Sequence, residues 1–296
     1  MNFLPKGIDP KEFLNLIREI GWKTNDLLRS YSQISENSSD FKKLEINELS
    51  TGPVTSADLA ANKLIIEGIK EKYPQQKWSF LSEENGKGKN NELFLNKDWV
   101  WIIDPLDGTR DFINNTGEYA THISLLFRRK NIFGSVFIPS REELWFYLEG
   151  FGSWLELKNS QKKTFKYLNE KKIDDLSVAI SKSHFHKELE LIINKLNISK
   201  MIGMGSIGYK ITSIIRGEAD LYISYSDKDK SCPKDWDMAA PEAIIRGFGG
   251  RFTDLNGSQL SFLDDENYSQ GGILVASMSN KHSEICNKIK IFSERN

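Results

Sequence analysis

The apolar run Trp99-Val100-Trp101-Ile102-Ile103 limits the possible folds of this chain more than any other segment. A strand formed by this run would present apolar side chains on both of its faces. Such a strand must be covered on each side by helices or by a second sheet. The run therefore predicts a layered α/β protein and excludes a sheet with one face in water.

The residues before this run predict two amphipathic helices. Asp9-Pro10-Lys11-Glu12 is typical of a helix start, with Asp as N-cap and Pro in the first turn, and apolar residues follow at helical spacing to Tyr31. Thr55-Ser56-Ala57-Asp58 opens a second helix, which must end before Pro74. The polar, aperiodic residues 35–50 between the helices predict a mobile loop. A short strand, 78–81, then delivers Ser82-Glu83-Glu84, and residues 85–97 predict a surface loop.

Three strand candidates follow the central run in close succession, which predicts an antiparallel meander: 121–127, 132–138 and 143–148. The polar, Lys-rich residues 158–175 are the best candidate for a linker. After them strands and helices alternate, with strands expected at 177–181, 219–225, 250–254 and 273–277 and helices at 187–196, 207–216 and 238–246, followed by a last helix that ends near residue 289.

This pattern predicts an alternating α-β-α-β-α sandwich. Residues 1–172 would form an N-terminal α+β domain with an antiparallel sheet. Residues 173–296 would form a C-terminal α/β domain.

Composition excludes several classes of protein. The chain has 40 basic and 41 acidic residues and no basic stripe, which argues against nucleic acid as a partner. Its longest uninterrupted apolar run, Trp99–Ile103, is far shorter than the roughly 20 residues that a membrane span needs. Two cysteines in 296 residues favour a reducing compartment. We therefore expect a soluble, cytoplasmic protein without a signal peptide.

The segment Ile103-Asp104-Pro105-Leu106-Asp107-Gly108-Thr109 carries the strongest indication of chemistry. A buried strand ends in a carboxylate, a turn follows at Pro105, and Asp107 adds a second carboxylate. Gly108 permits unusual backbone angles, and N–H groups at a helix start near Thr109 would attract an anion. Paired carboxylates suit a hard divalent cation. The segment predicts a pocket for a phosphate held by magnesium, although Asp-Pro and Asp-Gly are also common in plain turns.

The other candidate acids each have a simpler interpretation as well. Glu83-Glu84 could be a solvated loop, although its position after a strand favours a metal ligand. Asp58 could complete a capping pattern with Thr55, and Asp237 could cap the helix that follows it. The combination of these acids with the Asp104 segment is what the simpler interpretations leave unexplained.

That combination resembles the inositol monophosphatase-like superfamily, a group of lithium-sensitive, magnesium-dependent phosphatases. The resemblance covers residues 9–290 and rests on Glu83-Glu84, the run 104–109 and Trp236-Asp237-Met238-Ala239-Ala240. Within the superfamily the chain looks most similar to the 3'(2'),5'-bisphosphate nucleotidase branch. This similarity rests on the runs 53–58, 80–84, 109–113 and 117–119 and on Gly205-Ser206 with Lys210.

The resemblance implies a role for each site residue. Glu83, Asp104 and the carbonyl of Leu106 would bind one Mg²⁺, and Asp104, Asp107 and Asp237 a second. A third ion could bind between Glu83 and Asp58. Gly108 and Thr109 would donate backbone N–H groups to the phosphate, while Thr109 and Asp58 would orient and deprotonate the attacking water. His184, Ser206 and Lys210 would contact substrate.

Three observations leave room for other interpretations. Many members of the nucleotidase branch have a Lys and an Asp shortly before Pro-Val-Thr, whereas this chain has Glu48-Leu49-Ser50-Thr51-Gly52. This departure bears on how the adjoining loop supports the third metal. His184 and His186 lie near a strand end, but a single histidine is more often structural. Lys210 could equally be a solvated helix residue.

The sequence thus predicts a hydrolase that releases the 3'-phosphate of 3'-phosphoadenosine 5'-phosphate, with an inositol monophosphatase as the alternative. A non-catalytic phosphate-binding or scaffold protein would have lost an acidic ligand, and none is lost. The expected partner is a small phosphorylated molecule, and a homodimer is common in the superfamily.

Overall fold

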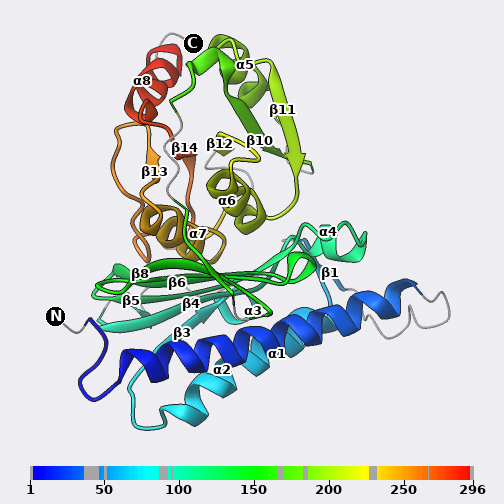
Figure 1. Ribbon diagram of the computed structural model, residues 1–296, viewed down its shortest axis with the longest axis vertical. Coiled ribbons are helices and arrows are strands. Elements are labelled where there is room, and N and C mark those ends of the chain that lie inside the picture. The colour runs from blue at the N-terminus through cyan, green and yellow to red at the C-terminus, as the bar shows by residue number, and fades with distance from the viewer. Residues whose placement is uncertain are drawn as a thin grey trace.

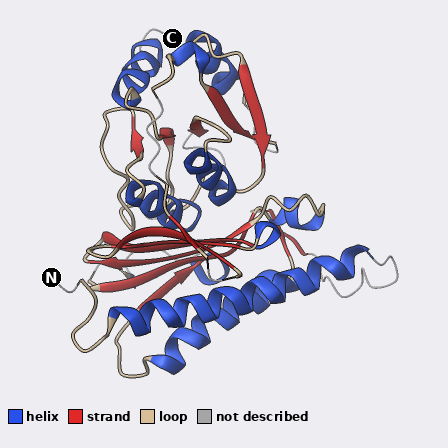
Figure 2. Cartoon of the chain, in the orientation of Figure 1, coloured by secondary structure: helices blue, strands red, loops and turns tan. Residues whose placement is uncertain are grey.

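The computed structural model describes residues 3–36, 47–49, 52–86, 93–94, 96–159, 161–165, 170–182, 186–226, 232–265 and 267–293. Helices and sheets alternate in five layers along the long axis of the molecule (Figure 1). Two helices cover one face of a seven-stranded sheet, two more lie between this sheet and a five-stranded sheet, and a last pair covers the far side (Figure 2). The predicted α-β-α-β-α sandwich is confirmed.

The first layer consists of helices α1 (Pro10–Glu36) and α2 (Ser56–Lys72). The predicted N-cap of α1 is present, because Oδ1 of Asp9 accepts the N–H groups of Lys11 and Glu12 at 2.9 and 3.0 Å. Helix α2 begins with a capping box, in which the side chain of Thr55 accepts a helix N–H and Asp58 accepts the N–H of Thr55. The capping interpretation of Asp58 is therefore correct, and it does not exclude a second role for the other oxygen.

The seven-stranded sheet carries the meander that the sequence predicted. Its order is β3-β4-β5-β6-β7-β8-β9; β3 and β4 are parallel, and the other neighbours are antiparallel. The strands are β3 (Ser79–Ser82), β4 (Trp99–Asp107), β5 (Ala120–Phe127), β6 (Lys130–Ile138), β7 (Glu143–Leu148), β8 (Gly152–Leu157) and β9 (Lys162–Lys163). Strands β8 and β9 were not predicted, and β9 lies within the predicted linker.

Strand β4 is buried on both faces, as the apolar run predicts. Trp101 and Ile103 pack with Phe13 of α1 and Ile65 of α2. Val100 and Ile102 point the other way, into the core between the two sheets. Because side chains alternate along a strand, Asp104 continues the inner face of Val100 and Ile102. This alternation therefore directs the carboxylate of Asp104 toward the layer between the two sheets.

The five-stranded sheet has the order β11-β10-β12-β14-β13. Strands β11, β10 and β12 are parallel, while β14 is antiparallel to both of its neighbours. The strands are β10 (Ser177–Ser181), β11 (Lys200–Met204), β12 (Leu221–Ser226), β13 (Arg251–Asp254) and β14 (Gly272–Ser277). Strand β11 was missed by the sequence analysis.

Helices cover both faces of this second sheet. Helices α5 (Lys187–Lys195) and α8 (His282–Ser293) form the outer layer, while α6 (Ile207–Arg216) and α7 (Asp235–Gly247) lie between the sheets. Helix α7 starts three residues earlier than the predicted 238, which places Asp237 inside its first turn.

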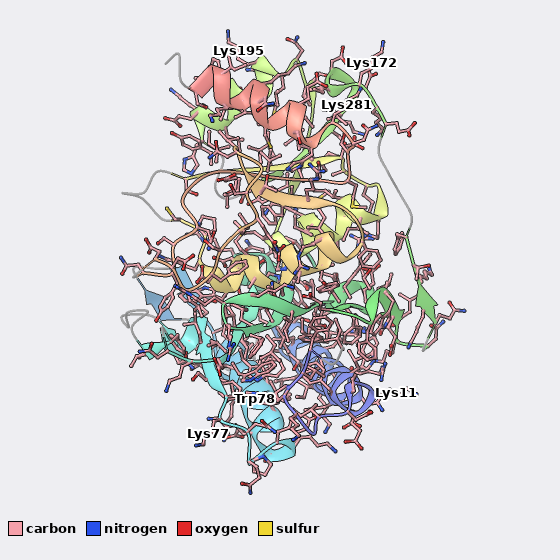
Figure 3. The ribbon with its side chains drawn as sticks, turned by 90° about the vertical axis from the view of Figure 1, so that its left-hand side faces the viewer. Lys11, Lys77, Trp78, Lys172, Lys195 and Lys281 are labelled. Carbon is pink, nitrogen blue, oxygen red and sulfur yellow. The ribbon has the colours of Figure 1, made fainter. Side chains whose placement is uncertain are left out.

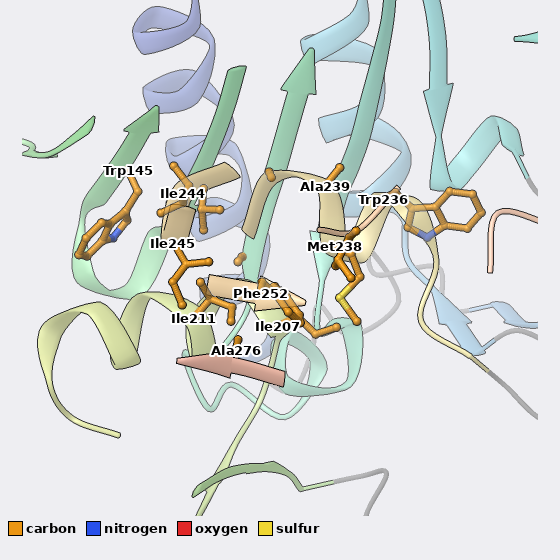
Figure 4. Packing of buried hydrophobic residues seen from close by; sticks show 14 of the residues in the cluster. Trp145, Ile207, Ile211, Trp236, Met238, Ala239, Ile244, Ile245, Phe252 and Ala276 are labelled. Carbon is orange, nitrogen blue, oxygen red and sulfur yellow. The ribbon is translucent and has the colours of Figure 1, made fainter. Parts of the chain in front are cut away.

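The largest core lies around α7, between the two sheets. Figure 4 shows Ile244 and Ile245 of α7 among side chains of both halves, including Trp145 of β7 and Phe252 of β13. The proposed domain boundary at 172/173 falls between β9 and β10, where the chain passes from one sheet to the other. The two halves nevertheless share this core, so the division into two domains remains a proposal.

Two predicted loops differ from the structure. Within residues 35–50, the segment β1 (Asn47–Leu49) pairs antiparallel with β2 (Gly52–Val54), so the loop prediction is wrong there. Residues 37–46 and 50 lie outside the described part of the chain. In the predicted loop 85–97, the first two residues belong to a short helix, α3 (Glu83–Gly86).

Lysines lie at both ends of the molecule. Figure 3 shows Lys11 and Lys77 at the end formed by α1 and α2, and Lys172, Lys195 and Lys281 at the opposite end. Within the described residues, no helix combines the length and the apolar character that crossing a membrane requires.

Candidate active site

The candidate site forms where β3 and β4 end beside each other. The two strands are parallel, so their carboxyl ends lie at the same edge of the sheet. Glu83 follows β3 directly, as the first residue of α3, and Asp104 lies in the corresponding part of β4. Adjacent parallel strands therefore bring together two acids that are 21 positions apart in the sequence.

A bulge in β4 turns Asp107 to the same side as Asp104. Asp104 pairs with His122 of β5, and Asp107 pairs with Ala120, so the register shifts by one residue between the two acids. In a regular strand, residues three apart face opposite sides, and an extra residue reverses the alternation. The sequence analysis predicted that the strand ends at Asp104, with a turn at Pro105. Instead β4 runs through Asp107, and the bulge gives both carboxylates one direction.

Helices from the C-terminal half fix the orientation of the acids on the inner face. Oδ2 of Asp107 accepts the backbone N–H groups of Ile207 and Gly208, at 2.6 and 3.3 Å, where α6 begins. Asp237 lies in the first turn of α7, and its Oδ2 accepts the N–H of Lys234. Helix N-termini stabilise carboxylates through their free N–H groups and the helix dipole. Asp237 is therefore not the N-cap residue of the helix, as the sequence suggested; Lys234 is the N-cap, and Asp237 lies at the third helical position, from which it accepts the N–H of Lys234.

Asp104 is buried and the other three acids are partly buried, and they lie close enough together to repel one another. Asp104 is fully buried, and burial together with Glu83, Asp107 and Asp237 raises its pKa well above the usual value. Burial, Asp107 and Glu83 likewise raise the pKa of Asp237. Oδ1 of Asp104 accepts the N–H of Leu106 at 3.0 Å, whereas no donor group in the described residues reaches its Oδ2.

This arrangement fits a divalent cation. A buried carboxylate oxygen without a donor is costly, and nearby like charges add to the cost. A divalent cation removes both penalties because it binds carboxylate oxygens directly and neutralises their charge. The structure therefore brings together Glu83, Asp104, Asp107 and Asp237, whose roles as ligands remain predictions.

Asp58 and Thr109 meet at the margin of this cluster. Oδ2 of Asp58 accepts the N–H and the hydroxyl of Thr55 at 2.8 and 2.6 Å. Oδ1 lies 3.3 Å from the hydroxyl of Thr109, which is also 3.2 Å from the carbonyl of Leu106. Burial raises the pKa of Asp58, although its hydrogen bonds act in the opposite direction. A carboxylate of raised pKa, anchored through one oxygen, suits the acceptance of a proton at the other.

Gly108 has the backbone conformation that the sequence predicted. Its φ of 86° is left-handed, and it precedes the short helix α4 (Thr109–Ile113). A side chain here would also be tight, because a Cβ atom would lie 3.1 Å from the Cβ of Ser206. Glycine is therefore required both by the turn and by the close approach of the two halves of the chain.

The proposed substrate residues have different surroundings. Ser206 is the N-cap of α6, with its hydroxyl accepting the N–H of Tyr209 at 3.0 Å. Lys210 is only 2% exposed, so its interpretation as a solvated surface lysine is wrong. Its ammonium donates to the carbonyl of Gly205, and burial lowers its pKa to about 8. His184 lies outside the described residues.

Two further residues join the site and were missed by the sequence analysis. Glu118 supports the start of α6, because its carboxylate accepts the N–H of Gly205 at 2.7 Å and its carbonyl accepts that of Ser206 at 2.8 Å. His122 is fully buried beside Asp107. Burial lowers its pKa despite the opposing effect of Asp107, which favours the neutral form of the imidazole. Only the register of β4 with β5 could have indicated His122.

The fold and the site together define a class: a layered α/β protein with a buried carboxylate cluster suited to divalent cations. The sequence model of the inositol monophosphatase family matches residues 9–293, nearly the whole chain. The chain belongs to the inositol monophosphatase family, and hence to a family of phosphatases.

Individual proteins with similar sequences or structures agree with this membership. A 3'(2'),5'-bisphosphate nucleotidase CysQ from Buchnera aphidicola is 32% identical over 212 residues, which cover 71% of this chain and 74% of the relative. The crystal structure of CysQ from Bacteroides thetaiotaomicron has a TM-score of 0.67 and 23% identity, covering 89% of this chain and 97% of that one. An IMPase of Thermotoga maritima has a TM-score of 0.73 and 18% identity, covering 96% and 99%.

Proposed function

We propose that this protein is a magnesium-dependent 3'(2'),5'-bisphosphate nucleotidase that releases the 3'-phosphate of 3'-phosphoadenosine 5'-phosphate. The observation that carries the hydrolytic part is the carboxylate cluster, in which a buried oxygen of Asp104 has no donor among the described residues. The similarity to CysQ nucleotidases supports the choice of substrate.

Two overlapping sets of residues would each bind one Mg²⁺. Glu83, Asp104 and the Leu106 carbonyl would hold one Mg²⁺, and Asp104, Asp107 and Asp237 a second. When bound, such ions acidify water and neutralise charge on the phosphate oxygens. The hydrogen bonds described above keep two of these ligands in place, because Asp107 and Asp237 are each fixed to a helix N-terminus.

Asp58 and Thr109 would orient the attacking water and accept its proton. The hydroxyl of Thr109 lies within hydrogen-bonding distance of Asp58 and would donate its proton there, which would leave the lone pairs of the threonine oxygen free to accept a hydrogen bond from the water. Asp58 is held in one rotamer by Thr55 and has the raised pKa that favours proton acceptance. No side chain needs to become covalently attached to the phosphate.

Substitution of Thr109 by alanine should lower kcat much more than it raises KM. The backbone N–H that would contact the phosphate survives the substitution, whereas orientation of the water is lost and is felt only in the transition state. We expect a fall of about 10²- to 10⁴-fold in kcat. Steady-state kinetics measure both constants, and Thr109→Ser, which keeps the hydroxyl, is the matched control. An effect on KM alone would make Thr109 a binding residue.

Substitution of Lys210 by alanine should selectively lower kcat/KM for 3'-phosphoadenosine 5'-phosphate. A substrate with a second phosphate needs a cation outside the carboxylate cluster, and the ammonium of Lys210 lies at the start of α6. A charge-assisted contact contributes roughly 1.5–3 kcal/mol, which is about 10- to 150-fold in affinity. The kcat/KM for inositol 1-phosphate should fall little, because this substrate has no second phosphate. The measurement is kcat/KM for both substrates.

The structure offers a competing role for Lys210 that the same measurement separates. Its hydrogen bond to Gly205 holds the turn before α6, to which Asp107 is fixed. If Lys210 only stabilises this turn, kcat/KM should fall by the same factor for both substrates. Lys200→Ala, an exposed lysine on β11, controls for the loss of one positive charge in the same half of the chain.

An inositol monophosphatase is the second candidate function, favoured by the family description and by the IMPases among the similar structures. Phosphate release from 3'-phosphoadenosine 5'-phosphate, inositol 1-phosphate and fructose 1,6-bisphosphate, each with Mg²⁺, distinguishes the two. The nucleotidase proposal expects the highest kcat/KM for the first substrate and inhibition by lithium. A preference for inositol 1-phosphate would reject it in favour of the second candidate.

A further inference from the structure

His122 lies inside the carboxylate cluster, although none of the roles proposed above uses it. It stands directly opposite Asp104 in the pairing of β4 with β5, and its side chain is fully buried. Its Nε2 atom is 3.4 Å from Oδ2 of Asp107. One donor atom from each of Asp104, Asp107 and His122 can be chosen so that all three lie within 4.8 Å of one another. The cluster thus contains a nitrogen donor as well as carboxylate oxygens.

The hydrogen bonding of His122 leaves the lone pair of Nε2 available. Nδ1 lies 3.4 Å from the carbonyl of Trp236, which can only accept, so this carbonyl can hold the ring proton on Nδ1 and leave Nε2 unprotonated. Nε2 then has a lone pair and faces a carboxylate oxygen that cannot donate to it. No donor or acceptor in the described part of the chain forms a hydrogen bond with Nε2.

This is the arrangement expected of a metal-binding imidazole. Histidine ligands usually donate their other N–H to a carbonyl or carboxylate, which fixes the tautomer and the ring orientation. The 3.4 Å between Nε2 and Oδ2 of Asp107 places the imidazole beside this carboxylate. Because Oδ2 already accepts two helix N–H groups, Oδ1 is the oxygen that would share an ion with Nε2.

We infer that His122 supplies a nitrogen ligand to the ion shared by Asp104, Asp107 and Asp237, so that this position binds Mn²⁺ more tightly than Mg²⁺, while either ion can occupy it in the proposed reaction. The inference rests on the metal centre proposed above. Mg²⁺ prefers oxygen ligands and retains its water, whereas first-row transition metals accept imidazole readily. The position formed by Glu83, Asp104 and the Leu106 carbonyl has oxygen ligands alone and suits Mg²⁺.

Pulsed electron paramagnetic resonance of Mn²⁺ tests the inference without any substitution. Metal-free protein is loaded with Mn²⁺, once with natural-abundance histidine and once with ¹⁵N-labelled histidine. Direct ligation predicts a ¹⁴N coupling that the label replaces by a ¹⁵N coupling. Bound Mn²⁺ without such a coupling would overturn the inference and leave the proposed function intact. Failure to bind either Mn²⁺ or Mg²⁺ would overturn both.

Substitution then assigns the signal to His122. His122→Asn should abolish the coupling, weaken Mn²⁺ binding in calorimetric titration by about 10- to 100-fold and reduce the preference for Mn²⁺ over Mg²⁺. His186→Asn, at the start of α5, is the matched control and should retain the coupling. A coupling that persists in His122→Asn, or an unchanged ratio of Mn²⁺ to Mg²⁺ affinity, would contradict the inference.

Discussion

Chelation of divalent cations is expected to abolish phosphate release, and added Mg²⁺ should restore it. The described site contains carboxylates around the buried Asp104, and cleavage of the phosphorus–oxygen bond of a phosphate monoester is too slow without strong charge neutralisation. Ca²⁺ should not replace Mg²⁺, because its larger and more flexible ligand shell would misplace the reacting groups. The measurement is phosphate release in excess EDTA, followed by titration with each cation. A full rate in EDTA would rule out the metal-dependent mechanism.

The same cations should stabilise the fold, and more strongly at higher pH. The pKa values of Asp104 and Asp237 are raised in the native state, so the native protein binds more protons than the unfolded chain above their ordinary pKa. The free energy of unfolding of the metal-free protein therefore falls as pH rises through the raised pKa values. Mg²⁺ binds the ionised forms and offsets this loss. A concentration 100 times the dissociation constant contributes about 2.7 kcal/mol.

Thermal unfolding between pH 5 and pH 8, with EDTA or with Mg²⁺, measures this dependence. The gap in melting temperature between the two conditions should widen as pH rises. Asp235 provides an internal reference, because burial raises its pKa to about 7 and its hydrogen bonds are to Leu263 and Gln270. The loss of protein stability that accompanies ionisation of Asp235 around pH 7 should appear both in EDTA and in Mg²⁺. A gap that stays constant with pH would contradict the proposed ionisation of the cluster.

Features set by local sequence could be predicted well. The caps at Asp9 and Thr55 are short-range hydrogen bonds, and they fixed where α1 and α2 begin. Helix α6 was predicted with its correct bounds, because Ser206 caps it and a glycine ends it. The both-sided burial of β4 followed from its composition alone. In each case the determining interactions lie within a few residues of one another.

Features set by contacts between distant segments could not be predicted. Strand β11 is an edge strand with largely exposed side chains, so its sequence has no apolar alternation. The bulge in β4 depends on pairing with β5, and it is what turns Asp107 toward Asp104. His122 enters the site through the same pairing. The acids were identified from the sequence, but their mutual orientation depends on the sheet register and on two helix N-termini.

Substitution of Asp104 by asparagine is expected to lower kcat on the order of a thousandfold or more, because this acid would serve both cations. The variant should remain folded. Its side-chain oxygen can still accept the N–H of Leu106, and its amide can donate to a neighbouring carboxylate. Removal of a buried charge also relieves the repulsion that raises the pKa of Asp104 in the metal-free protein.

The melting temperature of Asp104→Asn distinguishes a metal ligand from an acid with only a structural role. In EDTA at pH 8, Asp104→Asn should melt at a higher temperature than the unsubstituted protein, whereas saturating Mg²⁺ should stabilise it less. Asp98→Asn makes the same substitution at an exposed position just before β4 begins, and should change neither turnover nor the response to Mg²⁺. A structural acid would instead give a variant that is less stable in EDTA. A variant with a near-normal rate and an unchanged response to Mg²⁺ would show that Asp104 is not a ligand.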